Sequence, residues 1–423
     1  MTDIPMSAHE VARRYGISKN VGTTVLVPGA EIDTSGWFGG PPVAHEYGED
    51  AERVLAATPF GARANRAACV SSASLLANAF RIRRFESSGE YPFHALFPSV
   101  RAKYPILLGN RCGLVFDPWL WAWRGAESGG HGAAGPVDSA GYELRASVDR
   151  LPDFYGDLRT ILVRLELGMT LRHCAVTASV FGRELTDVVD DLSPRAPGTT
   201  FRVGEADDID PDIAPAAGPG NGTRTWATVL AARSAGRMPR GLPGLYLAPT
   251  SGLSGTQCAA LRRWTLSPGP ITAGCAAGLT LTLIVRTGTE FTVYSRAGTE
   301  QTWTRRILPQ SASAALLSGH GGENTPRNGN YLRRAEAVLF VTADLLEIQR
   351  EGGNRAVFRS CAQAGWIVQG LTYPAAYFDR IARPTRSFDD VTVTTALMLP
   401  RAHHVLLACV IGKSPVQGIE VPL

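Results

Sequence analysis

The stretch DLRTILVRLELGMTLRHCAVTASVFG, residues 157–182, decides the fold. Its apolar residues are too dense for the single stripe of a surface helix, so the sequence predicts a long and largely buried helix. The chain has 423 residues, of which 44% are hydrophobic, and this is enough to bury such a helix inside a sizeable core.

A second stretch, NRAVFRSCAQAGWIVQGLTYPAAYFD at residues 354–379, predicts another long apolar helix. When it is aligned with the first at a shift of 197 residues, three pairs are identical: Gly168 and Gly365, Ala178 and Ala375, Phe181 and Phe378. The identity is low, but the register is constant, which is typical of a tandem duplication. Two copies of one unit in a single chain would imitate a homodimer.

Strand candidates accompany the two helices in both halves. They are YPILL (104–108), CGLVF (112–116), GLTLTLIVR (278–286), EFTVYS (290–295), AEAVLFVTA (335–343) and HHVLLACVIG (403–412). A shorter helix is expected from Ser71 onward. Because helices and strands are interleaved, the chain belongs to the α+β or α/β class. We expect an N-terminal extension at 1–55 and two halves at 56–240 and 241–423.

Composition narrows the partners and the compartment. The formal charge of +4 arises from 42 basic and 38 acidic residues without a basic stripe, which argues against nucleic acid and favours a small-molecule or peptide partner. The 7 cysteines are spread without a C-x-x-C pair, as in a reducing cytoplasm. No signal peptide, membrane-length apolar run or calcium-loop spacing stands out, so we expect a cytoplasmic protein with no membrane contact and no metal.

Two segments of the first half partly match known sequence motifs. ARANR (62–66) is similar to a helix start R-R-S-x-R and keeps Arg63 and Arg66. PSVRAKYP (98–105) is similar to a loop P-S-x-G-x-x-Y-P, with Arg101 in place of the glycine. It keeps Pro98, Ser99, Tyr104 and Pro105.

Further segments continue the pattern. FYGDLRTILVRLELGM (154–169) is similar to W-K-Y-G followed by a helix with an L-D-A-G-H centre, and SFDDVTVTTALMLP (387–400) precedes a last strand that ends in Gly412 and Lys413. In this order, the segments resemble the nitroreductase family of flavin enzymes. Within that family they resemble the azoline dehydrogenases, which make thiazoles and oxazoles in ribosomal peptides.

The resemblance implies an α+β, nitroreductase-like fold, with two fused copies forming a pseudo-dimer within the chain. It implies FMN bound at the interface of the two units. It also implies a peptide substrate and a cyclodehydratase partner, and leaves a further homo-oligomer open. The second half keeps Arg262 and Arg263 near the position that matches Arg63, but not the P-S-x-G-x-x-Y-P loop, so one competent flavin site is expected rather than two.

The resemblance assigns the cofactor to the arginines, to the loop and to the end of the last strand. Arginine forks suit a phosphate or the carbonyl edge of a ring, and Ser99 can offer its hydroxyl and backbone N–H at a tight turn. Gly412 and Lys413 can close on the phosphate. The alternatives are exposed surface arginines, an ordinary turn and a simple reversal of the chain. Arg101 would either clash with the ring or reach its polar edge.

The proton chemistry is expected at Tyr155. The azoline dehydrogenases have a Lys-Tyr pair here, but Phe154 replaces the lysine, and the shift of 197 places Gly352 where the second copy would need its tyrosine. A phenol beside an apolar residue is a poor base unless a cation lies near, so Tyr155 could act as an acid or orient the substrate. Alternatively it is a packed aromatic residue. His173 is a spare candidate, although a single histidine on a helix is usually a core residue.

Three functions remain open. The first is an FMN-dependent dehydrogenase that oxidises azolines in a peptide. The second is a flavin oxidoreductase that uses NAD(P)H and reduces a small nitro or quinone-like acceptor. The third is a scaffold without turnover that binds a flavin or a partner.

Overall fold

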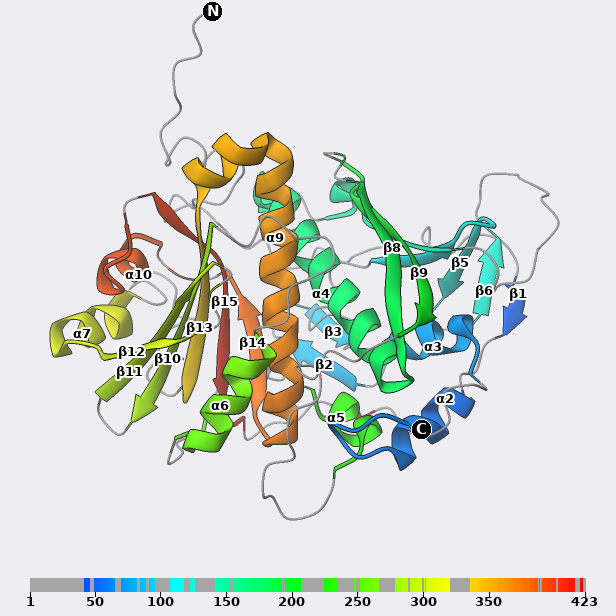
Figure 1. Ribbon diagram of the computed structural model, residues 1–423, viewed down its shortest axis with the longest axis horizontal. Helices are drawn as coiled ribbons and strands as arrows, with labels where there is room; N and C mark the ends of the chain where they lie inside the picture. Colours follow the sequence, from blue (N-terminus) through cyan, green and yellow to red (C-terminus); the bar gives the residue numbers. More distant parts are fainter. Residues whose placement is uncertain are drawn as a thin grey trace, which may run out of the picture.

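The computed structural model describes residues 42–45, 49–64, 70–81, 84–88, 91–95, 106–117, 122–125, 141–151, 155–191, 193, 195–206, 224–233, 247–248, 252–265, 278–287, 290–298, 300, 302–319, 335–386, 388, 390–400, 402–414 and 419–420. Figure 1 shows a helical pair in the middle of the molecule, with one large sheet on each side.

Seven of the described strands form the first sheet, which is antiparallel, in the order β1-β6-β5-β4-β7-β9-β8. Their bounds are β1 Pro42–His45, β4 Leu107–Asn110, β5 Leu114–Asp117, β6 Ala122–Gly125, β7 Tyr142–Arg145, β8 Arg183–Asp191 and β9 Gly198–Glu205. β1 lies in the stretch expected as an N-terminal extension, but it forms the outer edge of this sheet.

Six described strands form the second sheet, also antiparallel, in the order β12-β11-β10-β13-β15-β14. Their bounds are β10 Leu279–Thr287, β11 Glu290–Ala297, β12 Thr304–Ile307, β13 Ala337–Asp344, β14 Ile381–Thr385 and β15 His403–Gly412. This order repeats that of the first sheet strand for strand, with β12 in the place of β6 and no counterpart of β1 among the described strands. The chain therefore contains two fused copies of one α+β unit.

The long helices occupy the same place in each copy. α4 (Leu158–Val180) lies between β7 and β8 in the chain, and α9 (Leu345–Tyr377) lies between β13 and β14. Contacts between them advance along both helices together, which shows that the helices run in the same direction. The contacts are Arg164 at 3.7 Å over the Phe358 ring, Arg172 at 4.9 Å over Trp366, and His173 at 2.7 Å from the Tyr373 hydroxyl.

Two glycines allow α4 and α9 to touch through their backbones. A Cβ on Gly168 would lie 1.8 Å from the carbonyl oxygen of Ala362, and a Cβ on Gly365 would lie 1.9 Å from that of Leu165. The two contacts are equivalent, because the shift of 197 relates Gly168 to Gly365 and Leu165 to Ala362. The predicted register is therefore the register of a pseudo-twofold interface, and only glycine permits so close an approach.

The residues that flank the two helices are also related by the shift of 197. Gly156 before α4 and its counterpart Gly353 have φ of 51° and 60°, and Gly182 after α4 and its counterpart Asp379 have φ of 70° and 58°. All four have a positive φ, which an α-helix does not adopt. The predicted helix starts at residue 354, after the break at Gly352 and Gly353. α9 also includes a helical segment that precedes this break.

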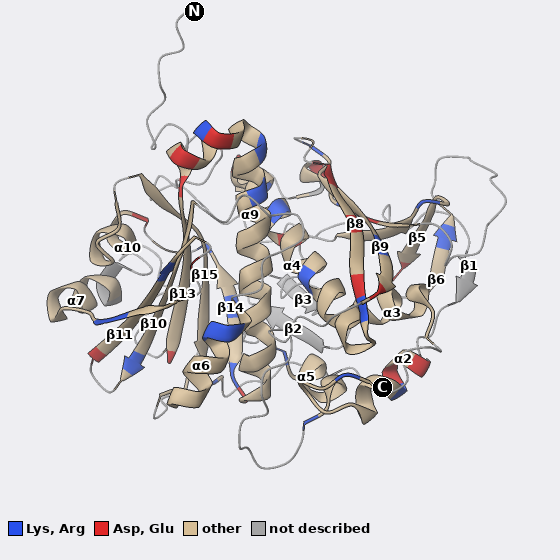
Figure 2. Cartoon of the chain, viewed as in Figure 1, with Lys and Arg blue, Asp and Glu red and all other residues tan. Residues whose placement is uncertain are grey.

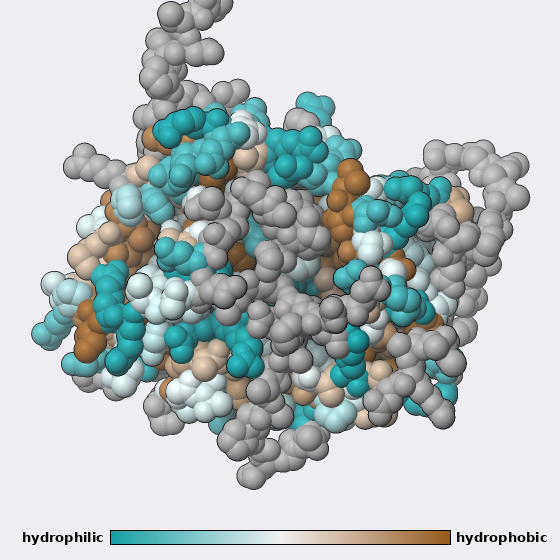
Figure 3. All heavy atoms as spheres, viewed as in Figure 1, coloured by the Kyte–Doolittle hydropathy of each residue, from teal (hydrophilic) through white to brown (hydrophobic). Residues whose placement is uncertain are grey.

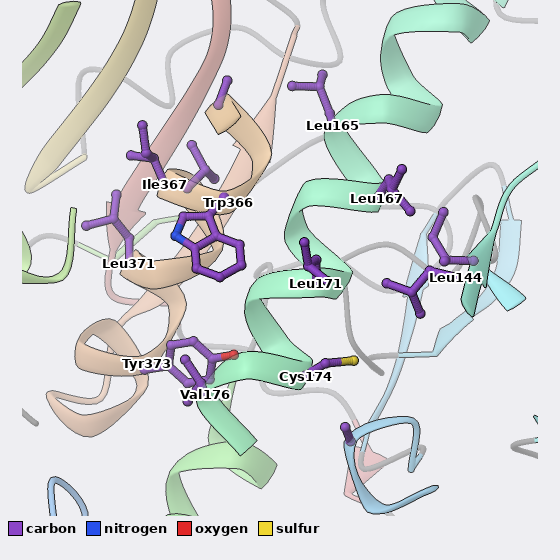
Figure 4. Packing of buried hydrophobic residues seen from close by; sticks show 14 of the residues in the cluster. Leu144, Leu165, Leu167, Leu171, Cys174, Val176, Trp366, Ile367, Leu371 and Tyr373 are labelled. Carbon is purple, nitrogen blue, oxygen red and sulfur yellow. The ribbon is translucent and has the colours of Figure 1, made fainter. Parts of the chain in front are cut away.

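The main core lies around the helix pair, between the two sheets. Figure 4 shows Trp366 of α9 between the two helices, while Ile367 and Leu371 lie on the far side of α9 and Leu167 of α4 lies toward Leu144 of β7. α3 (Ser72–Ala79) packs on α4 as α6 (Gly255–Trp264) packs on α9. The side chains of Ser71 and Ser254 cap these two helices, so the expected helix start at Ser71 is confirmed.

Smaller elements cover the remaining faces. α7 (Gln310–Gly319) and α10 (Asp390–Ala396) bury a second apolar cluster against the outer face of the second sheet. α2 (Glu49–Ala57) packs against α5 (Trp226–Ala232), which in turn contacts α9. The 3-10 turn Val148–Arg150 precedes α4.

Strand pairing and ion pairs also connect the two halves. β16 (Ile419–Glu420), from the end of the chain, pairs with β2 (Arg84–Ser88) of the first half, which pairs with β3 (Tyr91–Ala95). Asp190 of β8 receives two hydrogen bonds of 2.8 Å from Arg359 and one of 3.2 Å from Arg355, both on α9. Burial opposes ionisation of Asp190, but these arginines hold its pKa below the usual value.

The surface is mixed in character. Figure 2 shows acidic and basic residues together on the N-terminal turns of α9, and Figure 3 shows a hydrophilic area over the same turns. Among the residues whose burial the structure describes, the exposed large apolar ones are Val189, Ile307, Val391 and Met398. Among the described helices, none has the length and the apolar character to cross a membrane.

Candidate functional site

The carboxyl end of the helix pair, where α4 finishes at Val180 and α9 at Tyr377, gathers the predicted cofactor residues that the structure describes. β8 and β14 begin at this end, and β9 and β15 finish there (Figure 1). At this end Phe60 of the first half packs against aromatic residues of both halves. Its ring lies 4.6 Å from Trp226 of the first half, and 5.0 Å from Tyr377 and 6.0 Å from Trp264 of the second.

Arg63 lies in the coil between α2 and α3 at this end. The backbone N–H of Ala64 donates to the carbonyl of Val180 at 2.8 Å, and Trp226 Nε1 donates to the carbonyl of Ala62 at 2.9 Å. The segment was expected to open a helix, but this prediction is wrong for residues 62–64, because the helix begins only at Ser72. The side chain of Arg63 is half-buried, and its buried Nε has no hydrogen-bond partner among the described residues.

Gly412 and Lys413 lie at the same end, in the second half. The N–H of Ala248 donates to the carbonyl of Lys413 at 2.7 Å, which fixes the strand end against the segment that leads to α6. Gly412 lets this segment come close, since a Cβ there would lie 3.1 Å from Leu247. The side chain of Lys413 is exposed and forms no ion pair among the described residues.

The first half has a counterpart of this strand end. Gly412 pairs with Ile381, and Gly204 pairs with Glu184, which precedes Ile381 by 197 residues. Glu205 therefore occupies the position of Lys413. Its carboxylate lies 3.6 Å from Nε of Arg183, whose own counterpart Arg380 binds Glu336 at 2.5 Å. The two strand ends share one backbone arrangement but carry opposite charges.

Arg63 and Lys413 are donors of the kind that bind a phosphate or another anionic group, and the unpaired Nε of Arg63 is a specific reason to expect one. Arg63 and Lys413 come from different halves of the chain. Both lie at the carboxyl end of the helix pair, Arg63 beside the end of α4 and Lys413 at the end of β15.

Tyr155 stands at the opposite end of α4, directly before the helix, half-buried against the main core. The 23 residues of α4 span about 34 Å, so Tyr155 and Arg63 do not meet. Gly352, its counterpart at the shift of 197, forms part of the break in α9. The catalytic role of Tyr155 stays a prediction.

His173 is a core residue. It is 1% exposed, and its Nδ1 lies 2.7 Å from the hydroxyl of Tyr373, with the two rings stacked at 6.0 Å. Burial raises the pKa of Tyr373. The guanidinium groups of Arg233 and Arg172 lie 5.3 Å over Tyr373 and 4.9 Å over Trp366. The sequence did not single out this buried basic and aromatic group, because its members come from three separate helices and their flanks.

Other predicted residues have different outcomes. Arg262 and Arg263 lie in the last turn of α6, whereas Arg63 precedes α3, so the expectation that they match Arg63 is wrong. Arg66, Pro98, Ser99, Arg101 and Phe154 lie outside the described residues. Within the described residues, no group of His, Cys, Asp and Glu could hold a metal ion, and five cysteines are free: Cys112, Cys174, Cys258, Cys361 and Cys409.

Comparison with solved structures shows the fold. A candidate nitroreductase from Anabaena variabilis matches with a TM-score of 0.61 at 13% sequence identity, over 96% of this chain and 99% of that one. The E. coli microcin synthetase complex McbBCD matches at 0.33 and 14%, over 42% and 71% of the two chains. A candidate nitroreductase from Ralstonia eutropha matches at 0.32 and 14%, over 48% and 90%. The last two scores are too low to carry an argument.

No protein-family model and no curated protein matches the sequence. The similarity to the Anabaena protein extends over both halves. The fold is therefore nitroreductase-like, and the prediction of an α+β pseudo-dimer within one chain is confirmed.

Proposed function

We propose that the chain is a flavin-dependent oxidoreductase that uses FMN. The observation that carries this proposal is the nitroreductase-like fold in both halves, because a flavin site at the interface of two such units would then be complete within one chain. The cations at the carboxyl end of the helix pair support it. Arg63 supplies a buried donor that is unpaired within the described part of the chain. Lys413 supplies an exposed charge, and both residues suit the phosphate of FMN.

The finer proposal is an azoline dehydrogenase that acts on a ribosomally made peptide. It rests on the order of the motifs around Pro98, Ser99 and Tyr155, which resembles the azoline branch of the family. In such a reaction the ring loses a proton to a base and a hydride to the flavin, and the azoline becomes an aromatic azole. Arg66 and Arg101 would then assist in holding the cofactor.

Tyr155 would act on the substrate rather than on the cofactor phosphate. The length of α4 separates it from Arg63, so the two side chains cannot bind the same group. Its hydroxyl could orient an azoline ring or donate a proton. A cyclodehydratase partner, which forms the azolines, would supply the peptide.

The test is direct. We expect the purified protein to take up FMN with a yellow absorbance band, and we expect an azoline-bearing peptide to lose the mass of two hydrogen atoms per ring. If the peptide keeps its mass although the protein is saturated with FMN, the dehydrogenase proposal is contradicted. Absence of any flavin uptake would contradict the flavin proposal and favour a scaffold without turnover.

Arg63→Ala should lower the occupancy of FMN by roughly tenfold or more at limiting flavin, because it removes a charge-assisted donor. Arg53→Ala is the matched control, since Arg53 is an exposed residue of α2 that pairs only with Asp50 among the described residues. Equal occupancy in both variants would show that Arg63 does not touch the cofactor.

A second candidate is an NAD(P)H-dependent reductase of the same fold. Phe154 in place of the lysine favours it, because the azoline reaction needs a base at this position. Rapid bleaching of the flavin band by NADH or NADPH, without any change in the mass of the peptide, would support this reading.

A further inference from the structure

The outer edges of the two sheets occupy equivalent positions, but only the edge of the first sheet is paired with a further described strand. In the first sheet β1 pairs antiparallel with the outer side of β6 and covers its backbone. In the second sheet β12 occupies the place of β6, and no described strand pairs with its outer side. Arg305 and Ile307 of β12 are exposed, Ile307 to 59%.

We propose that β12 is a docking edge for an extended acidic peptide, which adds to the second sheet as β1 adds to the first. This surface is separate from the carboxyl end of the helix pair. It does not depend on the proposed function, although a peptide-modifying enzyme would have use for it. Strand addition of this kind draws affinity from backbone hydrogen bonds and specificity from alternate side chains.

The ladder shows which backbone groups are available. The N–H of Leu308 donates to the carbonyl of Phe291 at 2.9 Å, so this pair is a hydrogen-bonded pair of the β11–β12 ladder. Such pairs alternate along antiparallel strands. Arg305 and Ile307 therefore direct their N–H and carbonyl groups away from β11, toward the open edge.

The side chains define the chemistry of the partner. Arg305 stands opposite Tyr294 in the register, and the guanidinium of Arg262 lies 4.4 Å over the Tyr294 ring, so two cations share this face of the sheet. Arg305 forms no ion pair among the described residues. Ile307 adds an exposed apolar side chain two residues along the same face. A strand that alternates carboxylates with apolar residues matches this surface.

The same charges disfavour a second copy of the chain as the occupant. Pairing of β12 with β12 of another molecule would place Arg305 and Arg306 of one copy near those of the other. Like charges on paired strands are unfavourable. Basic residues on an edge strand are a common protection against self-pairing.

The probe is a fluorescent peptide of alternating valine and glutamate, and the matched control is the same peptide with lysine in place of glutamate. We expect the glutamate peptide alone to bind the full-length protein in fluorescence anisotropy. We expect it to slow hydrogen exchange in residues 304–307. Equal binding of both peptides, or binding without protection of β12, would overturn the proposal.

Ile307→Pro removes one donor from the open edge without removing a hydrogen bond to β11, so the fold should persist with an unchanged melting temperature. Binding of the glutamate peptide should weaken by roughly tenfold. Arg305→Glu should reverse the preference between the two peptides, whereas Arg53→Glu, the same charge change on the distant α2, should not.

If Ile307→Pro binds the peptide as tightly as the unchanged protein, the edge is not the binding surface. If the protein instead forms dimers that Ile307→Pro dissolves, the occupant is a second copy and the acidic-peptide proposal is wrong. Sedimentation velocity distinguishes these outcomes.

Discussion

Gly168 and Gly365 are the residues through which the two copies touch. We expect Gly168→Ala to lower the free energy of unfolding by about 3 kcal/mol, because the new methyl group would stand 1.8 Å from the carbonyl oxygen of Ala362 and the backbones would have to separate. Gly255→Ala in α6 is the control, since its methyl group would meet nothing within 4 Å. Urea unfolding measures both, and equal losses would contradict the argument.

Asp190 should make stability depend on pH. Its pKa is lower in the folded protein than in the unfolded chain, so its contribution is complete above the unfolded value of about 3.9 and disappears as the pH falls toward the folded value. We expect Asp190→Asn to cost about 2 kcal/mol at pH 7, with the difference from the unchanged protein shrinking below about pH 4. Unfolding curves at pH 7, 5 and 3 give the comparison, and a constant difference would refute it.

At the residue level the sequence predicted the interface better than the site. Three identities were sufficient to find the register of Gly168 and Gly365, because a duplicated helix keeps its spacing. The site depends on contacts between distant segments. Arg63 and Tyr155 both match motif positions, yet α4 holds them apart, and no local pattern reveals that distance. The opposite charges of Glu205 and Lys413 became meaningful only when the pairing of β8, β9, β14 and β15 was known.

Among the elements, β16 should hold the β2–β3 hairpin in place. A hairpin of two strands is marginal in water, and β16 supplies the third strand. We expect Ile419→Pro to speed hydrogen exchange in residues 84–95, since it removes a possible backbone donor beside Phe85, while exchange in α4 and α9 stays slow. Ile419→Val is the control. Unchanged exchange in the hairpin would show that it is stable without β16.

The predicted elements follow the burial of each segment. The six strand candidates correspond to β4, β5, β10, β11, β13 and β15, and both long helices were found, because their apolar residues are dense. The other described strands were missed, among them β8 and β9. β8 reads RELTDVVDD and has no fully buried residue, so its pairing with β9 is the only signal of a strand. Such pairing is a property of the folded sheet.

At the scale of the molecule, neither half should be stable alone. The helix pair forms the centre of the main core, and the predicted boundary near residue 240 would leave α4 and α9 each without a partner. We expect separate chains of residues 1–240 and 241–423 to aggregate when produced singly and to form a 1:1 complex when produced together. Light scattering after gel filtration measures the masses, and a stable monomeric half would contradict this expectation.

The fused arrangement also changes what mutation can achieve. In a dimer of identical chains one codon change alters both subunits, so the two equivalent strand ends would always carry the same residue. Here Glu205 and Lys413 are encoded separately, although the backbone places them alike. A single substitution can thus change the charge of one strand end without altering the other.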